Sequence, residues 1–312
     1  MRTVLVAGGA GFLGSHLCAS LLERGDQVIC VDDMSTGSRA NVSGLMATDR
    51  FSLLEADVSH DVPVASPVDA VCHLASPASP PAYLSRPMET LLVGSEGTRM
   101  LLELAVKNGA RFLLASTSEV YGDPEVHPQP ETYRGNVDPT GPRSVYDEAK
   151  RFAETLTMAA RRSWGANVGI ARIFNTYGPG LSPSDGRVVS NFIAQALRTQ
   201  PLTVYGDGTQ TRSLCYVDDL VRGFLALLDS SHLGPVNIGN PDERTVGDLA
   251  TTVLRLTGSS STVEYHPLPD QDPRRRCPDT SAALRLLGWR AEVPLETGLA
   301  RTIRWFRESL AV

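Results

Sequence analysis

The chain has 312 residues, of which 42% are hydrophobic and 21% charged, a size and composition typical of a globular enzyme built as one large α/β unit or two lobes. Its formal net charge of −6 argues against a nucleic-acid partner, because nucleic acids bind basic faces. The five cysteines are scattered without a CxxC pair, which indicates a reducing compartment and predicts a cytoplasmic protein.

The first 20 residues allow two interpretations. Arg2, an apolar stretch and a small-residue end resemble a secretory signal, whereas the glycines inside the stretch favour a binding turn. No segment approaches the ~18 apolar residues of a membrane span, so no membrane partner is expected. The six histidines show no spacing typical of metal ligands, and no metal site is expected.

Short apolar runs alternate with amphipathic stretches through the first half of the chain. The runs predict strands at 3–7, 28–31, 51–56, 69–75, 111–117 and 167–173. The amphipathic stretches predict helices at 12–24, 88–107 and 144–163. This alternation predicts an α/β fold with a Rossmann-type, doubly wound parallel sheet, in which ligands bind beyond the carboxyl ends of the strands.

The pattern changes near residue 175. Strand signals become short, as in "LTVYG", "PVNIG" and "TVEYH", and Pro and Gly become frequent. We interpret residues 1–174 as a dinucleotide-binding domain and 175–312 as a smaller C-terminal α/β substrate lobe, with an approximate boundary and interleaved lobes. Residues 122–143 hold five prolines and no periodicity, and a segment of this kind in a compact domain is usually functional.

Gly8, Gly11 and Gly14 lie directly after a predicted strand and open a predicted helix. This spacing allows a tight turn, a close approach to a pyrophosphate and helix packing on the strand, and it predicts a dinucleotide site. A purely structural glycine turn is the alternative. Asp32 follows the next strand, 18 residues after Gly14, and would bind a ribose 2′-hydroxyl, which favours NAD over NADP. Arg39 nearby weakens that preference.

Tyr146 and Lys150 are four residues apart in a helical pattern and therefore share one face. An ammonium beside a phenol favours the phenolate, so the pair predicts a general base. The alternative is an exposed tyrosine over a lysine stem. The strand at 111–117 runs into Thr117, Ser118 and Glu119, polar residues at a strand end where a ligand is expected.

These motifs resemble a known family over essentially the whole chain. The GxxGxxG turn, YxxxK, "TSEVYG", "RIFNTYGP" and "YVDD" are similar to extended short-chain dehydrogenases that act on nucleotide sugars. "HLASPASPP", "LASTSEVYGDPEVHPQ", "DGRVVSNFI", "PLTVYGDGTQTR" and "RRRCPD" resemble the UDP-glucuronate decarboxylase (UDP-xylose synthase) pattern.

The resemblance implies a reaction. Tyr146 would take the proton of the sugar 4-hydroxyl while NAD⁺ takes the C4 hydride, with Thr117 bonded to that oxygen. The 4-keto sugar would then lose CO₂, and return of the hydride would give UDP-xylose. A nucleotide-sugar 4-epimerase or 4,6-dehydratase is the alternative enzyme. A non-catalytic NAD-sensing protein on the same fold is the alternative from another class.

Two positions favour decarboxylation. Dehydratases of the family carry Asp where this chain has Ser118, and a neutral serine does not repel a substrate carboxylate. Arg276 matches the arginine that decarboxylases place in the site, where it would bind a carboxylate or phosphate. Glu119 would handle protons or water around C5, or merely pair with a nearby base. Cys277 departs from the polar residue expected next to Arg276.

The resemblance also implies the remaining site residues. The expected cofactor site comprises Gly8, Gly11, Phe12, Leu13, Gly14, Asp32, Asp57, Val58, Leu74, Ala75, Tyr146 and Lys150. Asp57 would face the adenine amino group, or else lie in solvent. The expected substrate site comprises Pro80, Pro81, Tyr83, Asn175, Arg187, Tyr205, Gln210, Arg212 and Arg276. Tyr205 would lie along uracil or belong to the core. Relatives pair as homodimers through the helices at 88–107 and 144–163.

Overall fold

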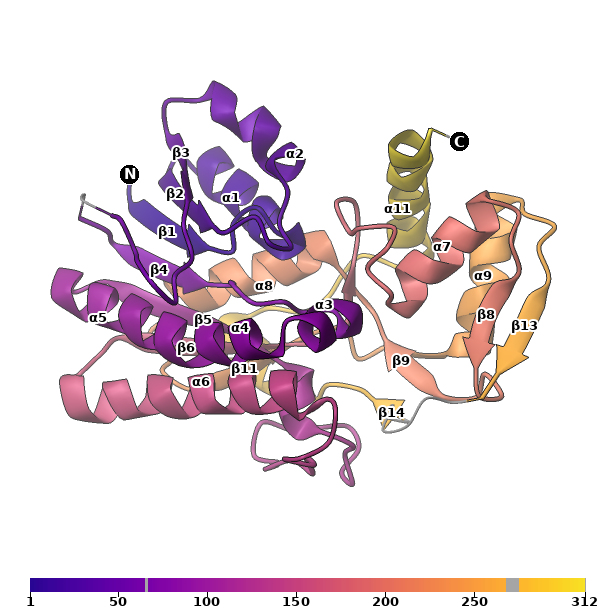
Figure 1. Ribbon diagram of the computed structural model, residues 1–312. Coiled ribbons are helices and arrows are strands. Elements are labelled where there is room, and N and C mark those ends of the chain that lie inside the picture. The colour runs from indigo at the N-terminus through magenta and orange to yellow at the C-terminus, as the bar shows by residue number, and fades with distance from the viewer. Residues whose placement is uncertain (65–66, 268–274, 312) are drawn as a thin grey trace.

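A central sheet of seven parallel strands organises the protein (Figure 1). The structure is a computed structural model that describes residues 1–64, 67–267 and 275–311. In spatial order the strands are β3 (Phe51–Glu55), β2 (Gln27–Asp32), β1 (Thr3–Ala7), β4 (Ala70–His73), β5 (Arg111–Thr117), β6 (Val168–Ile173) and β11 (Pro235–Ile238). The order 3-2-1-4-5-6 followed by β11 is that of a doubly wound Rossmann sheet, so the predicted fold class is confirmed.

Alternate residues of each strand point to opposite faces of the sheet, and both faces are covered. Val4 and Val6 of β1 pack in a core with α1 (Phe12–Glu23) and α8 (Val217–Asp229). Leu5 and Ala7 pack in a second core with α5 (Thr98–Asn108) and α6 (Ser144–Trp164). Strands buried on both faces carry continuous apolar runs, which is why their sequence signal was strong.

The helix predicted at 88–107 is interrupted. It comprises α4 (Pro87–Leu92), a π-helical turn at Val93–Gly97, and then α5. A Cβ on Gly94 would lie 2.8 Å from the Ala149 carbonyl oxygen on α6, so the glycine lets the two helices approach closely. A π-helical turn holds one residue more than an α-helical turn. Here the π turn includes Gly94, the residue that contacts α6.

The smaller lobe lies beside the carboxyl ends of the large sheet (Figure 1). Its helices are α7 (Val188–Leu197), α9 (Val246–Thr257) and α11 (Leu295–Leu310). Its strands form three small sheets: β8 (Leu202–Tyr205) with β13 (Val263–His266), β7 (Thr176–Tyr177) with β10 (Cys215–Tyr216), and β12 (Glu243–Thr245), β9 (Thr211–Ser213) and β14 (Arg275–Arg276). The shorter helices are α2 (Arg39–Val42), α3 (Pro80–Ser85), α10 (Ser281–Leu287) and 3₁₀ turns at Ser43–Ala47 and Ser118–Tyr121.

The chain crosses between the lobes more than once. The run "PVNIG", grouped above with the small-lobe strands, forms β11, which pairs with β6 in the large sheet. Helix α8, which precedes β11 in the chain, also packs against the large sheet. Asp218 and Asp219 lie in the first turn of α8, and the Asp219 carboxylate accepts hydrogen bonds from the Glu292 and Val293 amides, at 2.8 and 2.7 Å. A domain boundary near residue 174 stays a prediction.

Two further features bear on the site. Residues 122–143 form no helix or strand, and an isolated bridge between Gln129 and Pro278 joins them to the segment that follows β14. No helix in the described ranges is both long and apolar enough to cross a membrane.

Candidate active site

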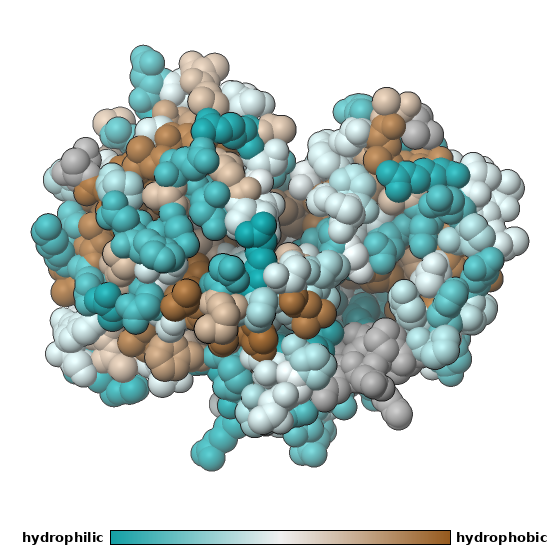
Figure 2. Space-filling model, viewed as in Figure 1, coloured by the Kyte–Doolittle hydropathy of each residue, from teal (hydrophilic) through white to brown (hydrophobic). Residues whose placement is uncertain are grey.

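A cavity of about 1160 Å³ lies between the lobes, at the carboxyl ends of the strands, and Figure 2 shows the cleft that separates the two lobes. A second cavity of about 80 Å³ adjoins it beside the first βα turn. Most of the predicted residues line the larger cavity: Gly8, Gly11, Phe12, Leu13, Gly14, Leu74, Pro80, Pro81, Tyr83, Thr117, Ser118, Glu119, Tyr146, Lys150, Asn175, Arg187, Tyr205, Gln210, Arg212 and Arg276. The smaller cavity is lined by Asp32, Asp57, Val58 and Ala75.

The glycine turn provides a cradle for a phosphate group. Gly8 has a φ of +79°, and a Cβ there would lie 2.6 Å from the Ala75 nitrogen. A Cβ on Gly14 would lie 2.0 Å from the Gly8 carbonyl oxygen, so α1 packs on the turn only because both side chains are absent. Helix α1 begins directly after Gly11, which orients its free amides toward the cavity edge. The turn therefore fits a dinucleotide pyrophosphate.

Asp32 ends β2 beside this turn. Its carboxylate accepts hydrogen bonds from the Ala10 and Met34 amides, both at 2.9 Å, and burial raises its pKa. These bonds fix the carboxylate at the cavity while it can still accept from a ribose hydroxyl. Arg39 pairs with Glu55 at 2.5 Å, so its charge is already matched, which agrees with a site for NAD.

Asp57 lines the smaller cavity, but its carboxylate also organises its own turn. It accepts hydrogen bonds from the Ser59 amide at 2.8 Å and the Ser59 hydroxyl at 2.6 Å, and it pairs with the His60 ring at 3.0 Å. The predicted contact with adenine stays a prediction, and these local bonds give Asp57 a structural role as well.

Tyr146 and Lys150 lie buried on the first turns of α6, facing the cavity. Tyr146 is 7% exposed, which rules out the alternative of a solvent-facing tyrosine. Lys150 Nζ donates a hydrogen bond to the Ala115 carbonyl at 3.1 Å and lies 5.8 Å from the centre of the Tyr146 ring. Tyr83 on α3 stacks against this ring with a centroid separation of 5.1 Å and an interplanar angle of 7°.

Burial opposes the charged form of both members of the pair. Burial raises the pKa of Tyr146, the negative charge of Glu119 raises it further, and the hydrogen bond with Thr117 opposes them. Burial also lowers the pKa of Lys150 to about 8. Lys150 and the positive charge of bound NAD⁺ are the groups expected to favour the phenolate, and burial opposes them, so the role of the pair as a general base stays a prediction.

Glu119 lies between two guanidinium groups at the end of β5. Arg143 Nη2 donates to Glu119 Oε2 at 2.8 Å, and Arg276 Nη2 donates to the same oxygen at 3.0 Å, while Arg276 Nη1 bonds to Oε1. Burial opposes ionisation, but Arg276 and then Arg143 outweigh it and lower the pKa of Glu119 to about 2. Glu119 is thus an ionised partner of these bases, which supports the simpler of its two predicted roles.

Arg143 was missed by the sequence reasoning. It lines the cavity and precedes Tyr146 by three residues, the spacing that places two residues on one helical face. That spacing was the available signal. Arg275 is exposed in β14, and Arg274, in the same arginine run, lies outside the described residues.

The far end of the cavity carries the residues expected to hold the nucleotide. Arg187 pairs with Asp185 at 2.5 Å, and Gln210 donates a hydrogen bond to the Tyr205 carbonyl. Tyr205 is 44% exposed, so the alternative that it belongs to the core is wrong. Its exposed ring lines the same cavity as Arg187 and Arg212, a combination that suits a base and a diphosphate.

Comparisons with known proteins agree with this geometry. A family model described as "NAD dependent epimerase/dehydratase family" matches residues 4–239. The chain is 51% identical to UDP-glucuronic acid decarboxylase 1 of Arabidopsis thaliana over 98% of this chain and 70% of that protein. It is 30% identical to a solved dTDP-glucose 4,6-dehydratase of Streptomyces venezuelae with NAD bound, with a TM-score of 0.90 over 99% of this chain and 98% of that one. A UDP-glucuronic acid 4-epimerase of Bacillus cereus, solved with UDP-glucuronic acid and NAD, is 27% identical, with a TM-score of 0.88 over 98% of this chain and 99% of that one.

Proposed function

The chain belongs to the NAD dependent epimerase/dehydratase family, and from this premise we propose that it decarboxylates UDP-glucuronate to UDP-xylose. One observation carries the proposal within the family. Arg276, a buried guanidinium, reaches the cavity beside the neutral Ser118, so the sugar end of the site can accept a carboxylate. The 51% identity to a UDP-glucuronic acid decarboxylase supports the same choice.

The glycine turn and Asp32 would hold NAD, with Val58, Leu74 and Ala75 lining the site around it. When bound, NAD supplies a hydride acceptor for C4 and a positive charge that Lys150 alone does not provide. Tyr146 would then take the proton of the sugar 4-hydroxyl, and Thr117, which is hydrogen-bonded to the phenol, would also bond to the sugar 4-oxygen. The exclusion of water by the stacked Tyr83 ring strengthens these interactions.

Oxidation at C4 makes the sugar a β-keto acid. Its C5 carboxylate leaves as CO₂, the bonding electrons delocalise onto the 4-keto oxygen beside Tyr146, and C5 then takes a proton from water. Tyr146 would return its proton to the 4-oxygen as the hydride returns to C4, which gives UDP-xylose and no net NADH. Arg276 would hold the carboxylate before it leaves, in competition with Glu119, which retains Arg143 as a partner. With a pKa of about 2, Glu119 is ionised near neutral pH and has no proton to donate. It would instead orient water and the two neighbouring arginines.

The alternatives within the family differ in product. A 4,6-dehydratase needs an acid to protonate the departing 6-hydroxyl, and Ser118 is too weak an acid for that step. A 4-epimerase needs the same oxidation but returns the hydride to the other face of the sugar. A non-catalytic NAD-sensing protein would not need a buried Tyr146 and Lys150.

The test is mass spectrometry of the purified protein incubated with UDP-glucuronate, with and without added NAD⁺. We expect loss of CO₂ to a UDP-pentose with no net NADH. Tyr146→Phe should reduce the rate at least ~1000-fold, because the general base is lost. Tyr265→Phe removes a hydroxyl from a side chain that is 62% exposed and should leave the rate unchanged. Formation of UDP-galacturonate at unchanged mass would make the protein an epimerase.

The assembly and location belong to the same proposal. Leu84, Met88, Leu92 and Phe152 are exposed apolar side chains of α3, α4 and α6, and Figure 2 shows hydrophobic side chains gathered over α3 and α4. They support a homodimer through these helices, which light scattering would test, with a monomer mass contradicting it.

The five cysteines are buried free thiols, which supports a cytoplasmic location. The small-lobe origin of Arg187, Tyr205 and Arg212 supports a substrate-binding role for residues 175–312.

A further inference from the structure

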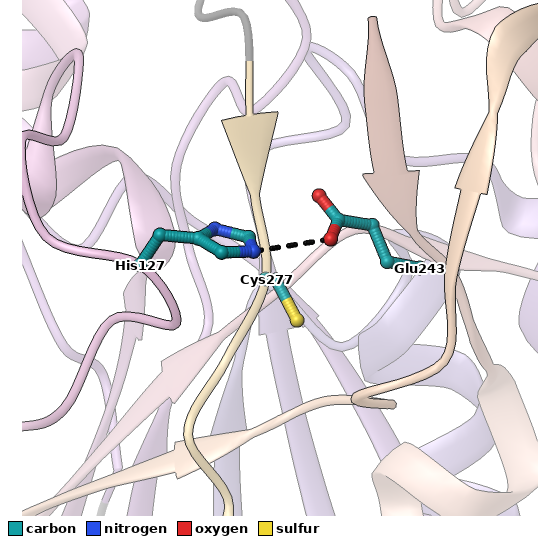
Figure 3. Close-up of side chains that lie close together, drawn as sticks. All are labelled: His127, Glu243 and Cys277. Atoms are coloured by element: carbon teal, nitrogen blue, oxygen red, sulfur yellow. Dashed lines mark ion pairs between the residues drawn. The ribbon is translucent and has the colours of Figure 1, made fainter.

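Three side chains outside the cavity bring together ligand atoms typical of a transition-metal site. The ring of His127, the carboxylate of Glu243 and the sulfur of Cys277 each offer one atom, and these atoms lie within 4.8 Å of one another. Figure 3 shows the imidazole and the carboxylate facing each other, with the Cys277 side chain beside the gap between them. The three residues come from three distant segments, which is why their sequence spacing revealed no site.

The fold explains why they converge. Strands β12 and β14 flank β9, with Glu243 opposite Ser213 and Arg276 opposite the neighbouring Arg212. Cys277 follows Arg276 directly, so Glu243 and Cys277 reach the same place from the two sides of β9. His127 arrives from the loop of residues 122–143, and its Nε2 lies 3.1 Å from Glu243 Oε2.

The donor set selects the metal. Imidazole nitrogen, thiolate sulfur and carboxylate oxygen are the ligands of Zn²⁺, whereas Ca²⁺ and Mg²⁺ take oxygen ligands. Tetrahedral zinc with bonds of about 2.0–2.3 Å places its ligand atoms about 3.3–3.7 Å apart. The His127–Glu243 separation is close to this value, and the thiol, which lies within 4.8 Å of both other ligand atoms, would move closer to complete the set.

Burial and neighbouring hydrogen bonds also suit a metal. Cys277 is 4% exposed, while the side chains of His127 and Glu243 are 26% and 20% exposed, so an ion can enter from solvent and keep a water ligand. The Thr211 hydroxyl donates a hydrogen bond to the second oxygen of Glu243. The Cys277 amide donates to Gln129 Oε1 at 2.9 Å, which fixes the cysteine backbone. Such bonds orient metal ligands.

We propose that His127, Glu243 and Cys277 form a zinc site that ties the 122–143 loop, β12 and β14 together. The charges balance, because a neutral imidazole, a carboxylate and a thiolate neutralise the divalent ion. The site lies one residue from Arg276, whose guanidinium pairs with Glu119 in the cavity. Bound zinc therefore restrains the strand that carries this arginine.

The test uses the full chain, stripped of metal with a chelator and titrated with Zn²⁺ against a chromophoric competitor. We expect one zinc per chain, and binding at least ~100-fold weaker in His127→Ala and in Cys277→Ala. Co²⁺ in place of Zn²⁺ should give a thiolate-to-cobalt charge-transfer band that Cys277→Ala abolishes. Circular dichroism checks that each variant is folded, and the exposed position of His127 makes its truncation mild.

Two matched variants serve as controls. His60→Ala removes an imidazole that also pairs with a carboxylate, at 3.0 Å, and Cys72→Ala removes another buried thiol. Both should bind zinc as the parent protein does, and zinc should raise the thermal midpoint of both but not of Cys277→Ala. Absence of stoichiometric zinc, or unchanged binding in Cys277→Ala, would overturn the proposal and leave a plain His127–Glu243 ion pair beside a buried thiol.

Discussion

Asp147 is a buried carboxyl next to the proposed base, and its surroundings oppose its charge. Burial has the largest effect, and the negative charge of Glu119 adds to it, so the pKa of Asp147 is raised to about 7 although Arg143 and Arg276 pull it down. One carboxylate oxygen of Asp147 is buried with no hydrogen-bond partner among the residues that the structure describes. Near neutral pH, ionisation of Asp147 in the first turn of α6 therefore lowers the stability of the fold.

The sign of this effect yields a prediction for Asp147→Asn. Because the folded-state pKa is raised above the value of 3.8 in the unfolded chain, ionisation lowers the free energy of unfolding as pH rises from about 4 to about 7. The variant should therefore be more stable than the parent at pH 8, by about 2–4 kcal/mol, and equally stable below pH ~4. Urea denaturation across this range measures the difference.

The control for this prediction is the next residue along the helix. Glu148→Gln removes the same charge from α6, but Glu148 is 40% exposed and pairs with Arg151. Its stability should differ from that of the parent by less than ~1 kcal/mol at every pH. Equal pH profiles for Asp147→Asn and the parent protein would show that Asp147 is ionised in the fold without penalty.

At the scale of elements, the contact between the π turn and α6 positions the helix that carries the proposed base. Gly94 packs directly against Ala149, which lies between Tyr146 and Lys150 in α6. Gly94→Ala would place a Cβ 2.8 Å from both the Ala149 Cβ and its carbonyl oxygen, so the helices must separate. We expect a loss of about 1–3 kcal/mol in the free energy of unfolding, measured by urea denaturation, and a lower kcat.

A second glycine and a compensating change make this prediction specific. Gly44→Ala adds a methyl group where nothing lies within 4 Å and should leave stability nearly unchanged. Ala149→Gly combined with Gly94→Ala removes one of the two clashes and should recover part of the loss. No loss in Gly94→Ala would mean that the π turn adjusts freely, and that it does not position Tyr146 and Lys150.

At the scale of the molecule, Asn237 joins segments far apart in the sequence. Its buried amide donates hydrogen bonds to the Gln129 carbonyl at 2.9 Å and the Asp279 carbonyl at 3.0 Å, and accepts one from the Tyr121 hydroxyl at 2.8 Å. Asn237 lies on β11 of the large sheet. Asp279 belongs to the segment that follows Arg276, and Gln129 forms a bridge with Pro278 of that segment. The Asn237 amide therefore anchors the strand that carries Arg276 to the Rossmann sheet.

Asn237→Ala should destabilise the protein by about 2–4 kcal/mol, because it removes three hydrogen bonds from the interior, although the Gln129 carbonyl and the Tyr121 hydroxyl each keep one other partner. It should also weaken UDP-glucuronate binding, since the anchor of Arg276 is loosened. The midpoint of urea unfolding and a binding isotherm measure the two effects. Asn136→Ala removes a single exposed hydrogen bond to the Asp123 carbonyl and should cost less than ~1 kcal/mol. Similar losses in the two variants would contradict an anchoring role for Asn237.

The sequence by itself determined the features that arise from local chemistry. Apolar runs specified the central strands because both faces of a parallel sheet are buried, and glycines specified the turn after β1, where a side chain on Gly8 or Gly14 would clash with backbone atoms. The spacing of Tyr146 and Lys150 placed them on one helical face. The resemblance to a family then added further site residues, and each of them lines one of the two cavities.

Only the tertiary structure decided how distant segments meet. It placed β11 in the large sheet, brought Arg143 and Arg276 to the same carboxylate oxygen of Glu119, and gathered His127, Glu243 and Cys277 around β9. It also showed that burial raises the pKa of Tyr146, against the direction expected from its lysine neighbour. These outcomes depend on packing and on desolvation, and both are set by contacts between residues that no local pattern connects.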